Sequence, residues 1–154
     1  MRRALVAFAL GITLAGCRPE AGASHPRAQV TVGMHHVQVD VADTPERKSR
    51  GLSGRTGLAE DRGMLFPYAR ADQHGFWMFD MHFDIDIVWI RDGRVVDVTH
   101  GAAHDPPGDL PIHRPSEPAD LVLEVPAGTA AQLGWRAGDP VQVKPPIPEA
   151  WKAP

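Results

Sequence analysis

The sequence predicts a mainly β (α+β) fold, a small antiparallel sheet or barrel-like domain with two short helices. Apolar and polar residues alternate along Val37–Val41, which is the period of a half-buried strand. Asp92 and Gly93 stand between two apolar runs, and this pair is a signal for a type I′ hairpin turn. The other apolar runs are short and do not alternate with long helical segments, as a parallel α/β sheet would require.

The first half of the domain contains one predicted helix and two further strand segments. Thr44–Glu46 supplies a capping hydroxyl, a proline and an acid, so a short helix should begin there and run to about Arg50. The glycine-rich residues 51–57 then end it. Residues 63–66 predict a short buried strand, and residues 76–90 predict one long strand or two broken ones.

The second half begins with the Asp92–Gly93 turn and continues into a strand over residues 94–99. A loop over residues 101–118 contains five prolines and is long enough to be functional or mobile. The sequence then predicts a strand over residues 121–125, a short helix over residues 127–133 and a last strand over residues 141–143.

The first seventeen residues resemble the export signal of a bacterial lipoprotein. Arg2 and Arg3 precede an apolar run, residues 4–13, that is too short to span a bilayer as a helix. The run ends in Leu14–Cys17, which places the single cysteine of the chain where a lipobox requires it. We therefore expect cleavage before Cys17 and lipid attachment to its thiol, although a signal cleaved without lipid or an uncleaved anchor are alternatives.

This resemblance implies an exported protein of the cell envelope, anchored to a membrane through the lipid on Cys17. Arg18, rather than an aspartate, follows the cysteine and favours the outer membrane, with the domain facing the periplasm. We accordingly divide the chain into a signal peptide (1–16), a flexible tether rich in Pro, Gly, Ala and Ser (17–29), one domain (30–144) and a proline-rich tail (145–154).

The charge and cysteine content exclude several classes of function. Without Arg2 and Arg3 the chain keeps 14 basic and 19 acidic residues, a net charge of −5. Such a mildly acidic domain is a poor candidate for binding nucleic acid. No cysteine is left for a disulfide, a thiolate metal site or a nucleophile.

A series of short motifs runs along the domain: Arg50-Gly51-Leu52, Arg55, Leu58, Gly63-Met64-Leu65-Phe66, Phe76-Trp77-Met78, Asp86, Asp92-Gly93 and Val122-Leu123-Glu124-Val125-Pro126-Ala127-Gly128. In order and spacing these motifs resemble the DUF192 (UPF0127) family. The resemblance extends over about Val37–Val143 and assigns residues 30–144 to a DUF192-like domain. It implies a compact, mostly β domain that occurs largely in exported or envelope-attached bacterial and archaeal proteins, and it implies no reaction.

The segment 79–86 departs from the family pattern and suggests metal chemistry. In an extended strand, Asp80, His82, Asp84 and Asp86 would share one face, opposite an apolar face. Carboxylates and an imidazole are ligands for a divalent cation, and a loop histidine such as His104 could complete the set. The other loop histidines that could contribute are His74, His100 and His113. The alternative is a solvent-exposed face of an amphipathic strand, with Asp86 paired to an arginine.

Arg55, Trp77 and Asp86 are the candidate ligand-binding residues. Arg55 and Asp86 could form a partly buried salt bridge that fixes the glycine-rich segment against the long strand, or they could anchor a ligand beside Trp77. Trp77 and Met78 could equally belong to the core, and Trp135 could be core or surface.

No motif for an enzyme is present. The serines lie in no Gly-x-Ser-x-Gly sequence, and no glycine-rich phosphate loop precedes a helix. A carboxylate pair for glycoside hydrolysis could be drawn from Asp80, Asp84 or Glu124 only if their distances allowed it. Two hypotheses remain: a non-catalytic binding or structural module that holds an envelope protein, a glycan or a small ligand, or a periplasmic protein that binds a divalent metal through residues 80–86 and loop histidines.

Overall fold

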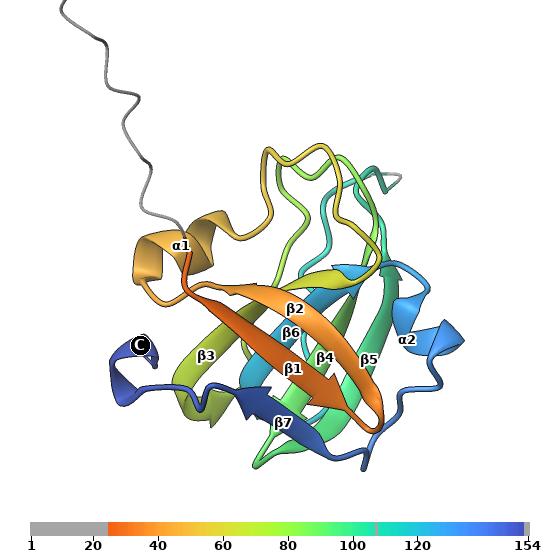
Figure 1. Ribbon diagram of the computed structural model, residues 1–154. Coiled ribbons are helices and arrows are strands. Elements are labelled where there is room, and N and C mark those ends of the chain that lie inside the picture. Colours follow the sequence, from red (N-terminus) through yellow and green to blue (C-terminus); the bar gives the residue numbers. More distant parts are fainter. Residues whose placement is uncertain (1–24, 107, 153–154) are drawn as a thin grey trace, which may run out of the picture.

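The computed structural model describes residues 25–106 and 108–152, so the predicted signal peptide and Cys17 lie outside the described residues. One seven-stranded sheet curls into a half-barrel and carries two short α-helices (Figure 1). None of the described helices is long or apolar enough to cross a lipid bilayer. The elements are β1 (Arg27–Val32), β2 (His35–Val41), α1 (Pro45–Arg50), β3 (Arg62–Asp72), β4 (Ile85–Arg91), β5 (Arg94–Ala102), β6 (Ala119–Pro126), α2 (Thr129–Gln132), β7 (Val141–Lys144) and the 3₁₀ turn η1 (Glu149–Trp151).

The strand order across the sheet is β5-β4-β6-β3-β2-β1-β7. The prediction of a mainly β, barrel-like domain with two short helices is confirmed, and the sheet is mixed because one pair of strands is parallel. β2 and β3 run parallel, with Val39 opposite Gly63. Residues 42–61, which include α1, return the chain to the end of the sheet at which β2 began, and this crossover makes the parallel pairing possible.

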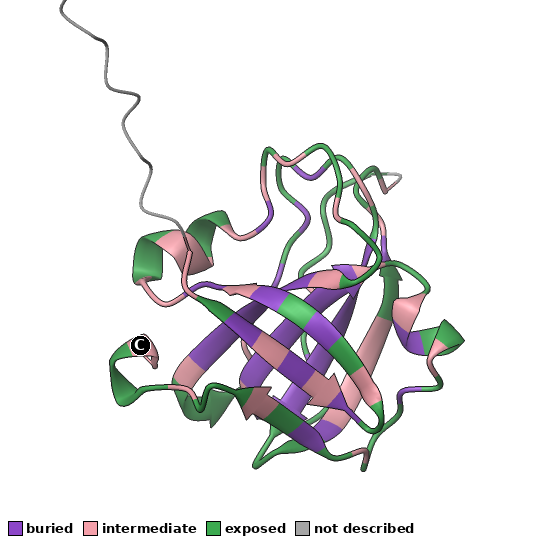
Figure 2. Ribbon diagram, viewed as in Figure 1, coloured by how far each residue is buried: buried purple, intermediate pink, exposed green. Residues whose placement is uncertain are grey.

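Two apolar cores lie on opposite faces of the sheet. Figure 2 shows that the buried residues concentrate on the strands. The inner core takes residues from all seven strands, among them Val39 and Leu123, and therefore fills the concave side. The outer core lies against β3, β4 and β6 and is covered by loop residues such as Leu52 and Met78. β6 serves both cores, because successive side chains of a strand point to opposite faces.

The local signals in the sequence predicted α1 and the β4–β5 hairpin correctly. The Thr44 side chain accepts a hydrogen bond from the Arg47 N–H, Pro45 stands in the first turn, and Gly51 follows the helix with a φ of 51°. Asp92 and Gly93 have φ values of 50° and 72°, which a type I′ turn requires at both positions. The predicted strands near 121–125 and 141–143 are confirmed as β6 and β7.

The predicted strand over residues 76–90 is wrong in its first half. Phe76 makes a single β-bridge with His113, and regular pairing begins only at Ile85. Asp80 adopts a left-handed φ of 55° in a turn, which breaks the two-residue alternation. Phe79, which that alternation would place on the apolar face, is 55% exposed, whereas Met81, Ile85 and Ile87 are buried in the outer core.

The boundaries at both ends of the domain also differ from expectation. β1 begins at Arg27, so residues 27–29 belong to the sheet rather than to the tether. In the predicted tail, Ile147 and Trp151 pack against the inner core, and η1 contacts β3. β3 runs on to Asp72, well beyond the short strand predicted over residues 63–66.

Asp86 does not pair with an arginine, which corrects the expectation for this residue. Its carboxylate is fully buried and accepts hydrogen bonds from the N–H of Gly101, at 2.8 Å, and of Ala130, at 2.9 Å. Gly128 at the start of α2 offers no side-chain cap, so Asp86 caps this helix from β4. One side chain thus joins β4, the end of β5 and α2.

Replacing Asp86 with alanine should destabilise the domain substantially. Two buried N–H groups would lose their acceptor, at about 1–3 kcal/mol each. We expect a loss of about 2–5 kcal/mol in the free energy of unfolding, measured by urea titration. Asp109→Ala, in an exposed loop, is the matched control and should change stability by less than about 0.5 kcal/mol. Equal stability of the two variants would contradict the capping role.

Candidate functional site

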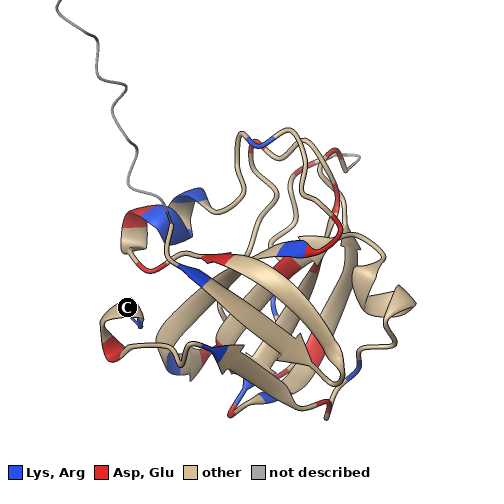
Figure 3. Cartoon of the chain, in the orientation of Figure 1, with Lys and Arg blue, Asp and Glu red and all other residues tan. Residues whose placement is uncertain are grey.

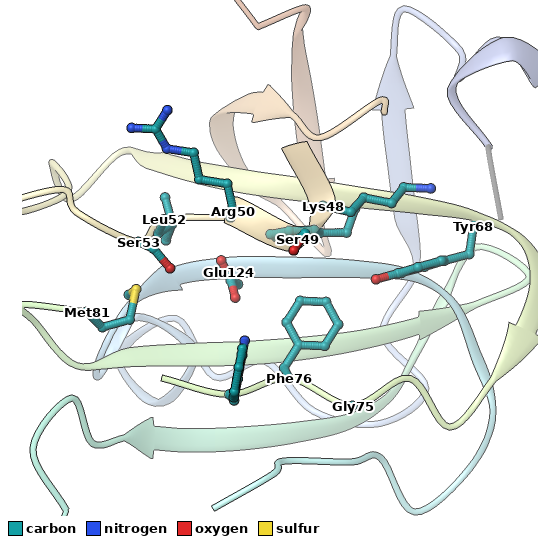
Figure 4. A pocket seen from close by; sticks show the side chains of 13 residues that line it. Lys48, Ser49, Arg50, Leu52, Ser53, Tyr68, Gly75, Phe76, Met81 and Glu124 are labelled. Carbon is teal, nitrogen blue, oxygen red and sulfur yellow. The ribbon is translucent and has the colours of Figure 1, made fainter. Parts of the chain in front are cut away.

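A pocket of about 140 Å³ lies beside the outer core, where the end of α1 and the following glycine-rich stretch meet residues 75–81 (Figure 4). The floor is provided by the sheet, with Phe66 and Tyr68 from β3 and Glu124 from β6. The pocket exists because loops rather than a second sheet cover this face.

Glu124 is the polar group at the base of the pocket. Its position on β6 places it on the same face as Val122, opposite Met64 of β3 and Ile87 of β4. The residue is 6% exposed, and its Oε2 atom is buried without a hydrogen-bond partner. Buried polar atoms are seldom left unpaired, so an unpaired carboxyl oxygen in a pocket calls for a functional explanation.

Gly63 allows β3 and β6 to approach closely at Glu124. A Cβ atom at position 63 would lie 2.7 Å from the Glu124 carbonyl oxygen, a contact that real Cβ atoms do not make. Glycine at this position is therefore required by the strand that carries the buried acid.

Burial controls the charge of the pocket. It raises the pKa of Glu124 to about 8, and the nearby positive charge of Arg55 offsets this effect only in part. Burial and the Glu124 charge together raise the pKa of Tyr68 to about 12. At neutral pH both groups are therefore mainly protonated, and both can donate a hydrogen bond.

Aromatic packing holds the apolar wall in place. The Phe76 ring meets Phe66 edge to face, with centroids 5.0 Å apart, and meets Trp89 in the same way at 5.4 Å. Such pairs restrict ring rotation and are worth roughly 0.5–1.5 kcal/mol each beyond area burial. Figure 4 shows the Phe76 ring between Glu124 and Tyr68, with the Tyr68 hydroxyl pointing toward the pocket.

The rim combines hydroxyl groups and cations. Ser49 and Ser53 line the pocket near Glu124, and the Ser53 hydroxyl donates to the Phe79 carbonyl at 2.8 Å. Basic residues gather on α1 (Figure 3), and two of them, Lys48 and Arg50, line the pocket with their charged ends turned outward in Figure 4. The Lys48 ammonium lies 4.6 Å from the centroid of the Tyr68 ring.

An exposed aromatic pair extends outward from the pocket. Trp77 lines the pocket, is 59% exposed and stacks on Phe79 with ring centroids 5.3 Å apart. The interpretation of Trp77 as a core residue is therefore wrong, whereas Met78 and Trp135 are buried in the two cores. Large exposed aromatic side chains next to a pocket are typical of binding surfaces.

Comparison with known proteins identifies the family. The DUF192 family model, described as "Uncharacterized ACR, COG1430", matches residues 28–143. The chain belongs to the DUF192 family. No curated protein matches the DUF192 chain significantly.

Two crystal structures resemble this DUF192 domain. One is a protein from Sinorhizobium meliloti 1021, provisionally named a transcription regulator, with 27% identity and a TM-score of 0.73 over 80% of this chain and 98% of that one. The other is a protein of unknown function from Novosphingobium aromaticivorans DSM 12444, with 30% identity and a TM-score of 0.69 over 86% of this chain and 99% of that one.

Arg55 takes a different partner in this DUF192 domain from the one expected. Its guanidinium donates two hydrogen bonds, both of 3.1 Å, to Oδ2 of Asp40 rather than to Asp86. Arg62 donates to the other oxygen of Asp40, also at 3.1 Å. This network fixes the glycine-rich stretch against β2, and it leaves Arg55 near enough to Glu124 to lower the pKa of that carboxyl.

The predicted metal ligands Asp80, His82, Asp84 and His104 do not converge. The His104 ring lies 2.6 Å from Asp84, and hydrogen bonds from His104 lower the pKa of that carboxyl. Asp80 and His82 lie 3.9 Å apart, on an exposed turn. Among the residues that the structure describes, no group of three or more His, Cys, Asp or Glu side chains is arranged to hold a metal ion.

The remaining loop histidines take separate places. His74 stacks on the Tyr68 ring at 3.6 Å, His113 pairs with Phe76 through the backbone, and His100 is exposed on β5. The metal hypothesis depended on an extended strand from Asp80 to Asp86, and the left-handed turn at Asp80 removes that geometry.

The role of Glu124 was missed, although the sequence carries a signal for it. Glu124 interrupts the apolar run Leu121–Val125, which was predicted to be a strand. A carboxyl inside a buried strand must be paired, protonated or functional. Only the three-dimensional structure shows that a pocket lies above it.

Glu124→Gln should change the pH dependence of stability. Because the folded pKa of Glu124, about 8, exceeds its ordinary value of 4.5, the folded state retains the proton that the unfolded chain releases. The contribution of Glu124 to the free energy of unfolding is therefore complete below pH 4.5. It is lost as pH rises through about 8, by roughly 1.4 kcal/mol per pH unit between these two values.

Chemical denaturation at several pH values tests this prediction. Between pH 5 and pH 8 the wild type should lose a few kcal/mol relative to Glu124→Gln, which cannot ionise. Glu60→Gln, at an exposed position, is the matched control and should follow the wild type. A difference between wild type and Glu124→Gln that stays constant with pH would contradict the raised pKa.

Proposed function

We propose that this DUF192 protein is an exported, lipid-anchored binding module of the cell envelope, and that its ligand inserts a small group into the pocket above Glu124. The observation that carries the proposal is the buried, unpartnered Oε2 of Glu124 at the base of a pocket whose rim includes the exposed Trp77. Perturbed titratable groups in clefts mark candidate functional sites.

The missing hydrogen bond of Glu124 favours ligand binding over a structural role. The other buried carboxylate among the described residues, Asp86, is matched by two N–H donors. Glu124 has instead a raised pKa, and its ionised form lowers stability above neutral pH. A ligand that supplies a partner for this oxygen would recover part of that free energy.

The chemistry of the pocket lining favours binding over catalysis. Among the described residues that line the pocket, Glu124 is the sole carboxylate, and no histidine is present. General acid–base chemistry usually pairs two titratable groups with separated pKa values. Here the second acid is Tyr68, whose pKa of about 12 makes it a hydrogen-bond donor rather than a base.

The sequence supports the envelope location. Arg2, Arg3, the apolar run and the lipobox Leu14–Cys17 form the pattern of a lipoprotein signal, and several acyl chains on one cysteine make a permanent anchor. We place the domain on the periplasmic face of the outer membrane because Arg18 follows the cysteine. The provisional name of the Sinorhizobium meliloti relative is not extended to this chain, because a net charge of −5 without the signal disfavours DNA binding.

Lipidation is tested by replacing Cys17 with serine in a Gram-negative host. We expect the wild type to incorporate labelled palmitate and to sediment with the outer membrane, because acyl chains insert into the bilayer. Cys17→Ser should lose the label and the membrane association. Labelled palmitate on Cys17→Ser, or an unlabelled wild type, would contradict the anchor.

Ligand entry is tested on the chain from residue 17 onward, carrying Cys17→Ser so that it remains in solution. A library of small oxygen-bearing fragments should shift the methyl resonance of Met81, which lines the pocket, in ¹H–¹³C NMR spectra. The methyl of Met34, 87% exposed at the β1–β2 turn and outside the pocket lining, is the internal control.

Glu124→Leu keeps a side chain of similar volume and removes the carboxyl. The fragment-induced shifts at Met81 should therefore disappear in this variant. If no fragment shifts Met81 in the wild type, or if the shifts persist in Glu124→Leu, the pocket is not the proposed binding site.

A further inference from the structure

The groups around Glu124 specify more than the presence of a ligand. They comprise hydrogen-bond donors, cations and a short apolar wall, and each restricts the class of chemical group that can enter. We propose, as an inference that rests on the proposed function of the pocket, that the inserted group is a carboxylate on a short aliphatic stem.

The hydrogen-bonding groups of the pocket are suited to an acceptor. The protonated Glu124 carboxyl and the Tyr68 phenol each offer an O–H, and the Ser49 hydroxyl lies at the rim. A carboxylate accepts several hydrogen bonds and donates none. A carboxylic acid that is kept neutral by apolar surroundings can donate to an anionic oxygen, and charge-assisted bonds of this kind are stronger than neutral ones.

The surrounding charge favours an anion over a cation. Lys48 and Arg50 line the pocket, and Arg55 acts on Glu124 from the adjoining glycine-rich stretch. An organic ammonium ligand would meet the positive charges of Lys48 and Arg50 at the rim and a mainly protonated Glu124 at neutral pH. A carboxylate meets opposite charges at the rim and a donor at the floor, so both features of the pocket favour it.

The size of the pocket limits what enters. The volume of the pocket, about 140 Å³, is smaller than the roughly 300–1,000 Å³ of pockets that hold drug-sized ligands. It is similar to the volume of cavities that hold a single small molecule. Leu52, Phe76 and Met81 provide apolar contacts for a short stem. A carboxylate with a few carbon atoms therefore fits, and a larger ligand would leave the remainder against Trp77 and Phe79.

The titration of Glu124 makes the proposal testable. Below about pH 8 Glu124 is protonated and donates to the ligand; above this value it is an anion and repels a carboxylate. The other charged or titratable groups near it are Lys48, Arg50, Arg55 and Tyr68, with Asp40 paired to Arg55. The pKa of Tyr68, about 12, keeps its phenol protonated at both pH 6.5 and pH 9. Binding of a carboxylate should therefore weaken about tenfold between these two pH values.

Propionate, propionamide and propylammonium form a set of probes of similar size, because each has a three-carbon chain and the three differ in charge. Each is titrated into the chain from residue 17 with Cys17→Ser, at pH 6.5 and pH 9, with the Met81 methyl as reporter and the Met34 methyl as control. Propionate should bind most tightly at pH 6.5 and about tenfold more weakly at pH 9. N-acetylalanine carries the carboxylate as it occurs at the C-terminus of a peptide. It should bind more tightly than propionate if the natural ligand is a peptide, and no more tightly if the natural ligand is a free acid.

Two variants separate the contributions of the donors. Glu124→Gln keeps an N–H donor and cannot ionise, so propionate affinity at pH 6.5 should stay within a few-fold of wild type and lose its pH dependence. Tyr68→Phe keeps the ring and removes one O–H, so it should weaken propionate at both pH values by up to about tenfold.

The outcomes distinguish this inference from the proposed function. If propylammonium binds more tightly as pH rises, or propionamide binds best at both pH values, the pocket is a binding site but the carboxylate inference is wrong. If neither the three probes nor the fragment library shifts the Met81 methyl, both the inference and the proposed function fail.

Discussion

β6 is the strand on which the rest of this domain depends, because it must bury both of its faces. Leu121, Leu123 and Val125 point into the inner core, and Val122 and Glu124 point to the outer side. The curl of the sheet itself closes the inner face. The outer face is closed only by loops, which pack less regularly than a second sheet would, and the gap they leave lies above Glu124. The strand that must be buried on both faces is thus also the strand that carries the candidate site.

Three carboxylates show how the domain treats negative charge. Asp40 is held by Arg55 and Arg62, and Asp86 by two backbone N–H groups. Both side chains join segments that are distant in sequence, and removing either would leave donors unsatisfied. Glu124 alone of the three has a buried oxygen without a partner. This contrast, rather than burial by itself, distinguishes a site from a structural element.

The sequence predicted those features that depend on local chemistry. The cap at Thr44, the Asp92–Gly93 turn and the alternation along β2 act within a few residues, so they could be predicted without knowing the fold. The parallel pairing of β2 with β3 and the partners of Asp86 depend on residues far apart in sequence. At Asp80 the two-residue alternation predicted a strand, but the residue adopts a left-handed turn. The predicted metal site depended on that strand and is therefore not formed.

The two outermost strands of the sheet meet at one corner. The Val95 N–H donates to the Asp139 carbonyl, the Val141 N–H donates to the Gly93 carbonyl, and an isolated bridge joins Arg94 to Pro140. Farther along β5, Asp97 accepts a hydrogen bond from the Ser116 N–H of the loop that lies beside it. Strand edges with free N–H and C=O groups recruit other chains into aggregates. The closed corner leaves fewer unpaired backbone groups on the two edge strands, which protects the domain against self-association where many copies are crowded together.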